Sequence, residues 1–223
     1  LCGIEFVEYA APDPTMLHKI FIDFGDEKVT KQEFKRVYEK NNTGEMVTKS
    51  SVEEYLDLYI NFKNENIVAN YKRSLNFDNA LAKTTYSIDG HQFSQKVFAS
   101  NPDDVLVIEL KTSNPDGMDF SLKMNRPQDK GQETVTVNNP SDTEISMKGM
   151  VTQYGGKKFS EPFPIDYGVK FETRLKVINN SGDVSAENGM LKLNGVKEAT
   201  IYLVANTSFY HDDFETKNTK TLS

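Results

Sequence analysis

The sequence of 223 residues has no tryptophan, a single cysteine, Cys2, and three histidines. A lone cysteine excludes an internal disulfide and a cysteine-based zinc site. The histidines, His18, His91 and His211, form no H-E-x-x-H pattern or other close pair, so we expect no metal site and no cofactor. The G-x-S-x-G, P-loop and G-x-G-x-x-G motifs are also missing. Common sequence signals of a serine nucleophile or a nucleotide site are therefore absent.

The sequence has fewer positively than negatively charged residues and no long apolar run. The chain has 26 Lys and Arg against 33 Asp and Glu, a net charge of −7. Such a surface repels phosphate backbones, so nucleic acid is not an expected partner. No apolar run approaches the ~18 residues of a membrane helix, so we expect no membrane span. The four residues before Glu5 are too few for a signal peptide, and we expect that any export signal has been removed.

Alternation of apolar and polar residues with period two is the dominant pattern. It places Leu56, Leu58, Ile60 and Phe62 on one face of a strand. Similar patterns predict strands over residues 81–88, 91–99, 105–112, 118–125, 134–137, 144–154, 169–178, 190–193 and 200–205. Turn residues separate them at 89–90, 114–117, 138–140, 155–156, 179–182 and 194–195. This order predicts an all-β fold, a large antiparallel β-sandwich.

One short helix is predicted near the N-terminus. Thr30 and Glu33 have the spacing of a capping box, and Phe34, Val37 and Tyr38 then form one apolar stripe. The first ~50 residues therefore differ from the rest, and we expect a small βα appendage or an insertion there. Residues 209–214, after the last strand, are expected to be a solvated segment.

Candidate chemistry is sparse. Adjacent carboxylates occur at residues 53–54, 103–104 and 212–213. Glycoside hydrolysis needs two carboxyl groups across the scissile bond, whereas neighbours on a strand point to opposite faces. From the sequence alone, no two carboxylates can therefore be identified as a catalytic pair. Tyr55 and Tyr59 flank Asp57 on the polar face of their strand, which is a possible sugar platform; ordinary cross-strand pairing is the alternative.

Three segments carry a more specific pattern: residues 55–62, 71–82 and 95–105. They resemble the N-terminal domain of bacterial α-L-fucosidases of glycoside hydrolase family 95, a domain of the glycosyl hydrolase family 65 N-terminal type. The corresponding family segments read G-D-L-Y-L-x-F, Y-x-R-x-L-D-L-x-x-A-x-A and R-E-x-F-A-S-x-P-D-x-V. Residues 168–208 also follow the order of that family, so the resemblance covers about residues 52–210. The Gly-rich opening of the family has no match in residues 1–54.

The resemblance implies a β-sandwich that precedes an (α/α)6 barrel, and the catalytic carboxylates lie in that barrel. No catalytic residue is therefore carried over to this chain, which we predict to be inactive alone. Its expected role is structural support of the barrel, in cis or in trans, in a bacterial enzyme of polysaccharide degradation. The alternatives are a stand-alone carbohydrate-binding module for fucosylated or other glycans, and a complete hydrolase with an unrecognised carboxylate pair.

The resemblance also implies how the chain is divided and where it is found. Residues 1–51 form an N-terminal extension, residues 52–210 form the sandwich, and residues 211–223 form a tail or the start of a linker. From the resemblance to this family, we expect the protein to be periplasmic or secreted.

Overall fold

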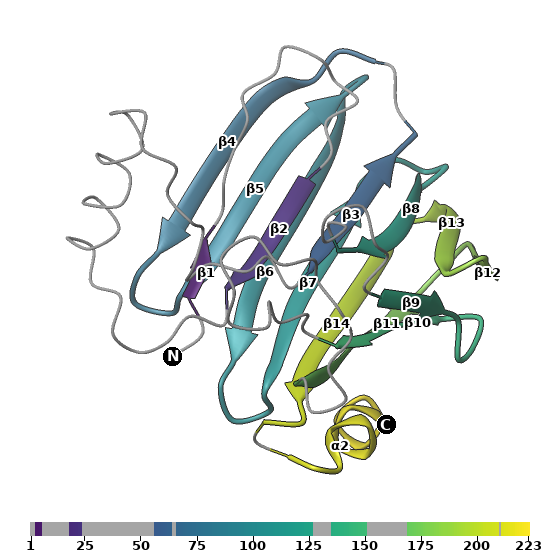
Figure 1. Cartoon of the computed structure of the whole chain (residues 1–223). Coiled ribbons are helices and arrows are strands. Elements are labelled where there is room, and N and C mark those ends of the chain that lie inside the picture. Colours follow the sequence, from purple (N-terminus) through teal and green to yellow (C-terminus); the bar gives the residue numbers. More distant parts are fainter. Residues whose placement is uncertain are drawn as a thin grey trace, which may run out of the picture.

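The computed structural model describes residues 3–5, 18–23, 56–63, 66–126, 135–150, 169–209 and 211–223, with side chains from residue 56 onward. The described strands form two sheets that lie face to face (Figure 1). The six-stranded sheet has the order β1 (Gly3–Glu5), β2 (His18–Asp23), β3 (Asp57–Phe62), β8 (Met118–Asn125), β13 (Met190–Val196) and β12 (Asp183–Glu187). The eight-stranded sheet has the order β4 (Ala69–Asn76), β5 (Leu81–Ile88), β6 (His91–Ser100), β7 (Val105–Thr112), β14 (Glu198–Thr207), β11 (Lys170–Asn179), β10 (Glu144–Met150) and β9 (Val135–Asn138).

All the strand pairs in both sheets are antiparallel, which confirms the predicted all-β sandwich. The core lies between the sheets, where the period-two pattern placed it. Leu58 and Ile60 of β3 pair with Met124 and Leu122 of β8, and all four side chains are buried. These rows share one core cluster with buried side chains of the eight-stranded sheet, such as Ile108 and Ile201. Burying one such side chain contributes about 1.5–3 kcal/mol, so this shared cluster holds the two layers together.

The predicted turn at Asp89 and Gly90 joins β5 to β6. Both residues have positive φ, 50° and 80°, and Ile88 pairs directly with His91. Two positive φ angles give the turn a twist that matches that of the flanking strands. This short connection fixes the register of the whole β5–β6 pair.

The turn predicted at residues 194–195 is wrong, because both residues lie inside β13. The register with β8 shifts between Leu193 and Val196, which marks a bulge, and Gly195 has a φ of +66°. A Cβ on Gly117 would touch the backbone of Gly195 at less than van der Waals distance. Glycine is therefore needed here because two backbone segments come close together, and not because the chain reverses its direction.

A helix, α2 (Phe214–Thr221), follows the last strand and packs against β11 and β14. The expected solvated segment at residues 209–214 is therefore wrong at its end, where Phe214 is buried. Phe214, Asn218 and Leu222 repeat every four residues and are the buried members of this segment. That spacing puts the three side chains on one helix face, which lies toward the sheet.

The N-terminal residues contribute to the sandwich. β2 pairs with β3, and β1 pairs with β2, so these two strands extend the six-stranded sheet at one end. The helix predicted after Thr30 and the turn at residues 155–156 lie outside the described residues. Within the described part of the chain, no helix has the length and apolar character needed to cross a bilayer.

Candidate functional site

The predicted sugar platform lies on β3, at the face of the six-stranded sheet that points away from the core. The hydroxyl of Tyr59 donates a hydrogen bond to Oδ2 of Asp57 at 2.9 Å. Asp57 is 3% exposed, and Tyr59 is partly buried. Tyr55 lies outside the described residues. The structure thus brings Tyr59 and Asp57 together, and the sugar platform stays a prediction.

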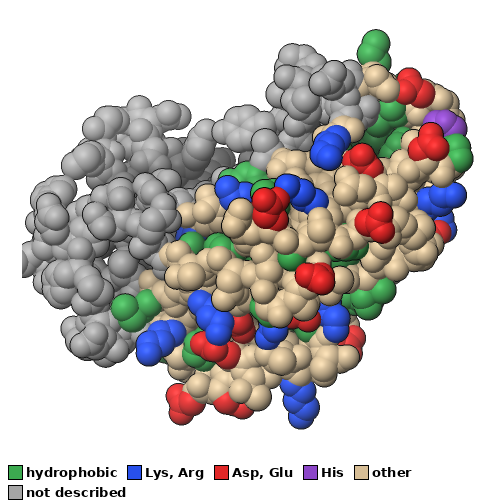
Figure 2. Space-filling view, turned by 90° about the vertical axis from the view of Figure 1, so that its right-hand side faces the viewer, with side chains coloured by type: hydrophobic (Ala, Val, Ile, Leu, Met, Phe, Trp, Pro, Cys, Tyr) green, Lys and Arg blue, Asp and Glu red, His purple; other side chains and the backbone are tan. Residues whose placement is uncertain are grey.

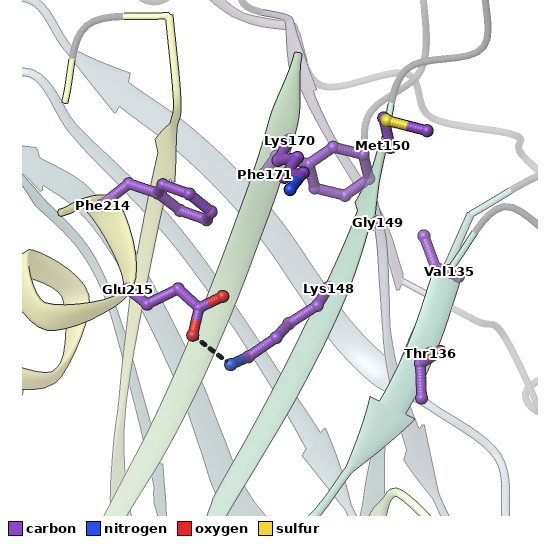
Figure 3. Close-up of a pocket in the computed structure, with 9 residues that line it drawn as sticks. All are labelled: Val135, Thr136, Lys148, Gly149, Met150, Lys170, Phe171, Phe214 and Glu215. Carbon is purple, nitrogen blue, oxygen red and sulfur yellow. Dashed lines mark hydrogen bonds and ion pairs between the residues drawn. The ribbon is translucent and has the colours of Figure 1, made fainter. Parts of the chain in front are cut away.

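A groove of about 510 Å³ lies between the start of α2 and strands β9, β10 and β11 (Figure 3). It is lined by Val135, Thr136, Lys148, Gly149, Met150, Lys170, Phe171, Phe214 and Glu215. In Figure 3, Glu215 reaches from α2 toward Lys148 on β10, and the two side chains form an ion pair with a 2.5 Å distance between Nζ and Oε2. The groove thus has a charged side at this pair and an apolar side at Phe171.

A second carboxylate, Glu172, lies beside the same lysine. Its side chain is 2% exposed, and its Oε1 lies 3.8 Å from Nζ of Lys148. Ser146 donates to Oε1 at 2.7 Å, and the amide of Asn218 donates to Oε2 at 3.1 Å. Each oxygen of this buried carboxylate therefore has a donor, as burial of a charge requires.

The arrangement favours a structural role for these acids. An ammonium group lies between Glu172 and Glu215, whereas a glycosidase keeps the space between its two carboxyl groups for the scissile bond or a water. Asn218 ties Glu172 to α2, and its own Oδ1 accepts from Nδ2 of Asn206 on β14 at 2.7 Å. The network therefore fastens α2 to the sheet.

Two more cations on β11 bind the same helical segment. Arg174 makes an ion pair with Glu144 at 2.8 Å and donates to the hydroxyl of Thr219. Lys176 donates to the backbone oxygen of Leu222 at 2.6 Å. Positive groups near the carbonyl end of a helix also favour its dipole. Residues 214–222 are thereby fixed along their whole length.

Among the residues that the structure describes, two side chains have clearly shifted pKa values, and neither suits acid–base catalysis near neutral pH. Burial, and to a lesser degree the neighbouring Tyr71, raises the pKa of Tyr86 to about 12. A hydrogen bond from Lys192, together with its positive charge, lowers the pKa of the exposed Glu187. Tyr86 is thus a neutral phenol and Glu187 an ion-paired surface carboxylate.

No group of three or more metal-ligating side chains occurs in the ranges that the structure describes. In the same ranges, Nε2 of His211 contacts Nζ of Lys217 at 3.2 Å, and that lysine also forms an ion pair with Asp104. The histidine is part of the contact between α2 and the β6–β7 turn.

The fold and this groove together define a two-sheet module with a fastened C-terminal helix. The model of the glycosyl hydrolase family 65 N-terminal domain matches residues 26–212, so the chain belongs to that family. The match begins at residue 26, whereas the resemblance inferred from sequence motifs begins at about residue 52. The predicted resemblance to an N-terminal sandwich domain of glycoside hydrolases is confirmed.

Individual proteins are similar to parts of this chain. The chain is 30% identical to alpha-L-fucosidase 2 of Arabidopsis thaliana over 151 residues, which cover 63% of this chain and 17% of that protein. It is 54% identical to protein MelA of Shewanella colwelliana over 43 residues, 19% of this chain and 12% of MelA. A solved structure described as a putative kojibiose phosphorylase from human microbiome aligns with a TM-score of 0.45 and 12% identity, covering 76% of this chain and 26% of that chain. The chain thus spans less than a fifth of the curated relatives that it matches.

Proposed function

We propose that these residues form a non-catalytic β-sandwich module of an α-L-fucosidase-like glycoside hydrolase and support the catalytic barrel of that enzyme. The observation that carries the proposal is the match to an N-terminal domain family over residues 26–212. The similarity to an α-L-fucosidase supports the substrate class. The carboxylates around Lys148 support the lack of catalysis, because they are used to hold α2.

The first experiment measures hydrolysis of an aryl α-L-fucoside by the purified 223-residue chain. We expect no turnover above the blank, with Arabidopsis alpha-L-fucosidase 2 as the positive control. Turnover by the folded chain that survives repeated purification would refute the non-catalytic role. The coding sequence that follows Ser223 in the genome gives an independent test, since we expect it to encode a helical region of several hundred residues.

Location and wider role follow from the same proposal. An enzyme that removes fucose from polysaccharides meets its substrate outside the cytoplasm, so we propose a periplasmic or secreted bacterial protein. Fractionation of the source cells, with immunodetection of the chain, would test this. A signal confined to the cytoplasmic fraction would contradict it.

Carbohydrate binding is a second candidate, favoured by an aromatic ladder on the eight-stranded sheet. Tyr86 stacks on Phe93 with ring centroids 5.3 Å apart, and Tyr71 lies next in the row at 6.5 Å. Tyr71 at the end of this row is 50% exposed, so part of a rigidly held ring is accessible to a sugar face. Binding of fucosylated glycans at millimolar concentration, lost in Tyr71→Ala, would support this candidate over a purely structural role.

A further inference from the structure

Two glycines of the sequence follow an asparagine, a context in which the asparagine side chain is prone to deamidation. The pairs are Asn188-Gly189, between β12 and β13, and Asn194-Gly195, within β13. Because glycine has no Cβ, its backbone nitrogen can approach the side-chain amide of the preceding asparagine closely. Both asparagines are exposed, so water reaches their side chains.

The nitrogen of Gly189 is held by a side chain from a distant part of the sequence. Its N–H donates to Oδ1 of Asn139, the residue after β9, at 2.8 Å (Figure 1). The amide of Asn139 donates in turn to the backbone oxygens of Glu144 at 3.0 Å and Met190 at 3.4 Å, which fixes its orientation. Asn139 itself precedes Pro140, whose nitrogen carries no hydrogen, so it cannot deamidate by the same route.

The nitrogen of Gly195 is held in the same way by a carboxylate. Its N–H donates to Oδ1 of Asp119 on β8 at 2.8 Å. This bond lies at the bulge of β13, where the register with β8 shifts. A hydrogen bond to a charged acceptor is about twice as strong as a neutral one. Both Asn-Gly nitrogens thus have a side-chain acceptor, and the two acceptors come from different strands.

We propose that Asn188 and Asn194 are latent deamidation sites, which Asn139 and Asp119 protect by binding the hydrogen of the glycine nitrogen. This inference is separate from the proposed function, because it needs neither a catalytic barrel nor a sugar.

The hydrogen bonds oppose the first step of the reaction. The glycine nitrogen must lose its proton and attack Cγ of the asparagine; the N–Cγ bond forms, the Cγ–Nδ2 bond breaks, and the proton leaves with Nδ2 as ammonia. Water then opens the five-membered ring and gives aspartate or, if the backbone C–N bond breaks, isoaspartate. An acceptor bound to the N–H favours the protonated nitrogen, so it slows the attack.

Deamidation would change both the charge and the geometry of this hairpin. Each event adds one negative charge to a chain of net charge −7. The side that carries β12 and β13 in Figure 1 faces the viewer in Figure 2, where acidic and basic side chains are interspersed. Isoaspartate also adds one carbon to the main chain, which at residue 188 would lengthen a turn whose two residues have φ of 51° and 75°. Protection therefore preserves the β12–β13 pairing.

The test follows deamidation of the whole 223-residue chain by peptide mapping and mass spectrometry, with capped peptides of residues 185–192 and 191–198 as unprotected references. We expect both asparagines to react at least about tenfold more slowly in the folded chain than in the peptides. Asn139→Ala should speed the reaction at residue 188 by about fivefold, the factor that corresponds to one neutral hydrogen bond, and leave residue 194 unchanged. Asp119→Ala should do the reverse, with about tenfold or more at residue 194.

Each alanine variant is therefore the control for the other, and a conservative variant tests the acceptor itself. Asp119→Asn keeps an oxygen acceptor at the same place, so the rate at residue 194 should stay within about threefold of that of the native chain. The proposal is overturned if the folded chain deamidates as fast as the peptides, or if neither alanine variant speeds its own site. Equal acceleration of both sites by each variant would show general opening of the hairpin and overturn it as well, as would equal rates in Asp119→Asn and Asp119→Ala.

Discussion

Asn218 is the residue through which α2 is most directly held. Its side chain is fully buried, and its amide donates to the backbone oxygen of Glu172 at 3.0 Å and to Oε2 of the same residue at 3.1 Å. Its Oδ1 accepts from Asn206. Asn218→Ala removes all three hydrogen bonds at once and leaves their partners without this contact.

The size of the effect can be worked out from these bonds. A neutral hydrogen bond contributes about 1 kcal/mol, and one to a charged group about 2 kcal/mol, so the three together contribute about 4 kcal/mol. An eight-residue helix is marginal in water without its packing. We therefore expect Asn218→Ala to release α2 from the sheet while the sandwich stays folded.

Amide hydrogen exchange measures this release directly. Exchange in residues 214–221 should speed up by about a thousandfold, which corresponds to ~4 kcal/mol, or reach the rate of an unstructured peptide. Thr216→Ala, on the exposed side of α2, is the matched control and should change exchange by less than about threefold. An increase below about tenfold in Asn218→Ala would refute the assignment of the network as the main attachment of the helix.

Three further predictions concern the sandwich. Gly117→Ala should lower the free energy of unfolding by about 3 kcal/mol or more, because its Cβ would meet the backbone of Gly195. Gly90→Ala, with open space around the new Cβ, should lower it by only ~1 kcal/mol. Equal losses of the two variants in urea unfolding would disprove the close approach. Burial gives Tyr86 a pKa of about 12 in the folded chain against the ordinary tyrosine value of 10.0, so the stability that it contributes below pH ~10 is lost as pH rises through 12. Urea midpoints between those pH values should fall less in Tyr86→Phe. Phe120→Ala should cost about 3–5 kcal/mol, since this ring is 1% exposed, and a loss below ~1 kcal/mol would contradict its place in the core.

The sequence pattern predicted strands best where one face is buried and the other is polar. Strands β5, β7 and β8 begin and end where the alternation predicted them. β4 was not predicted, because it is exposed on both faces and its residues show no burial pattern. β12 was missed for another reason: Val184 and Ala186 do alternate with polar residues, but the strand has only five residues. Two-sided exposure removes the signal on which such predictions depend.

The groove and the helix attachment show a different limit. The four-residue spacing of Phe214, Asn218 and Leu222 was a helical signal, but a polar residue at its centre hid the apolar stripe. The pairing of Glu172 with Asn218 joins residues 46 positions apart, and local pattern carries no information on such a contact. Tyr59 and Asp57 came together as predicted neighbours because they share one face of one strand.

The position of β14 has a consequence for how the protein is made. This strand is the last of the described strands, yet it lies between β7 and β11 in the middle of the eight-stranded sheet. Until residues 198–207 leave the ribosome, the nascent chain holds two partial sheets with facing open edges. Completion of the eight-stranded sheet thus waits for residues 198–207, and a chain cut before Glu198 would lack the strand that joins the two halves of this sheet.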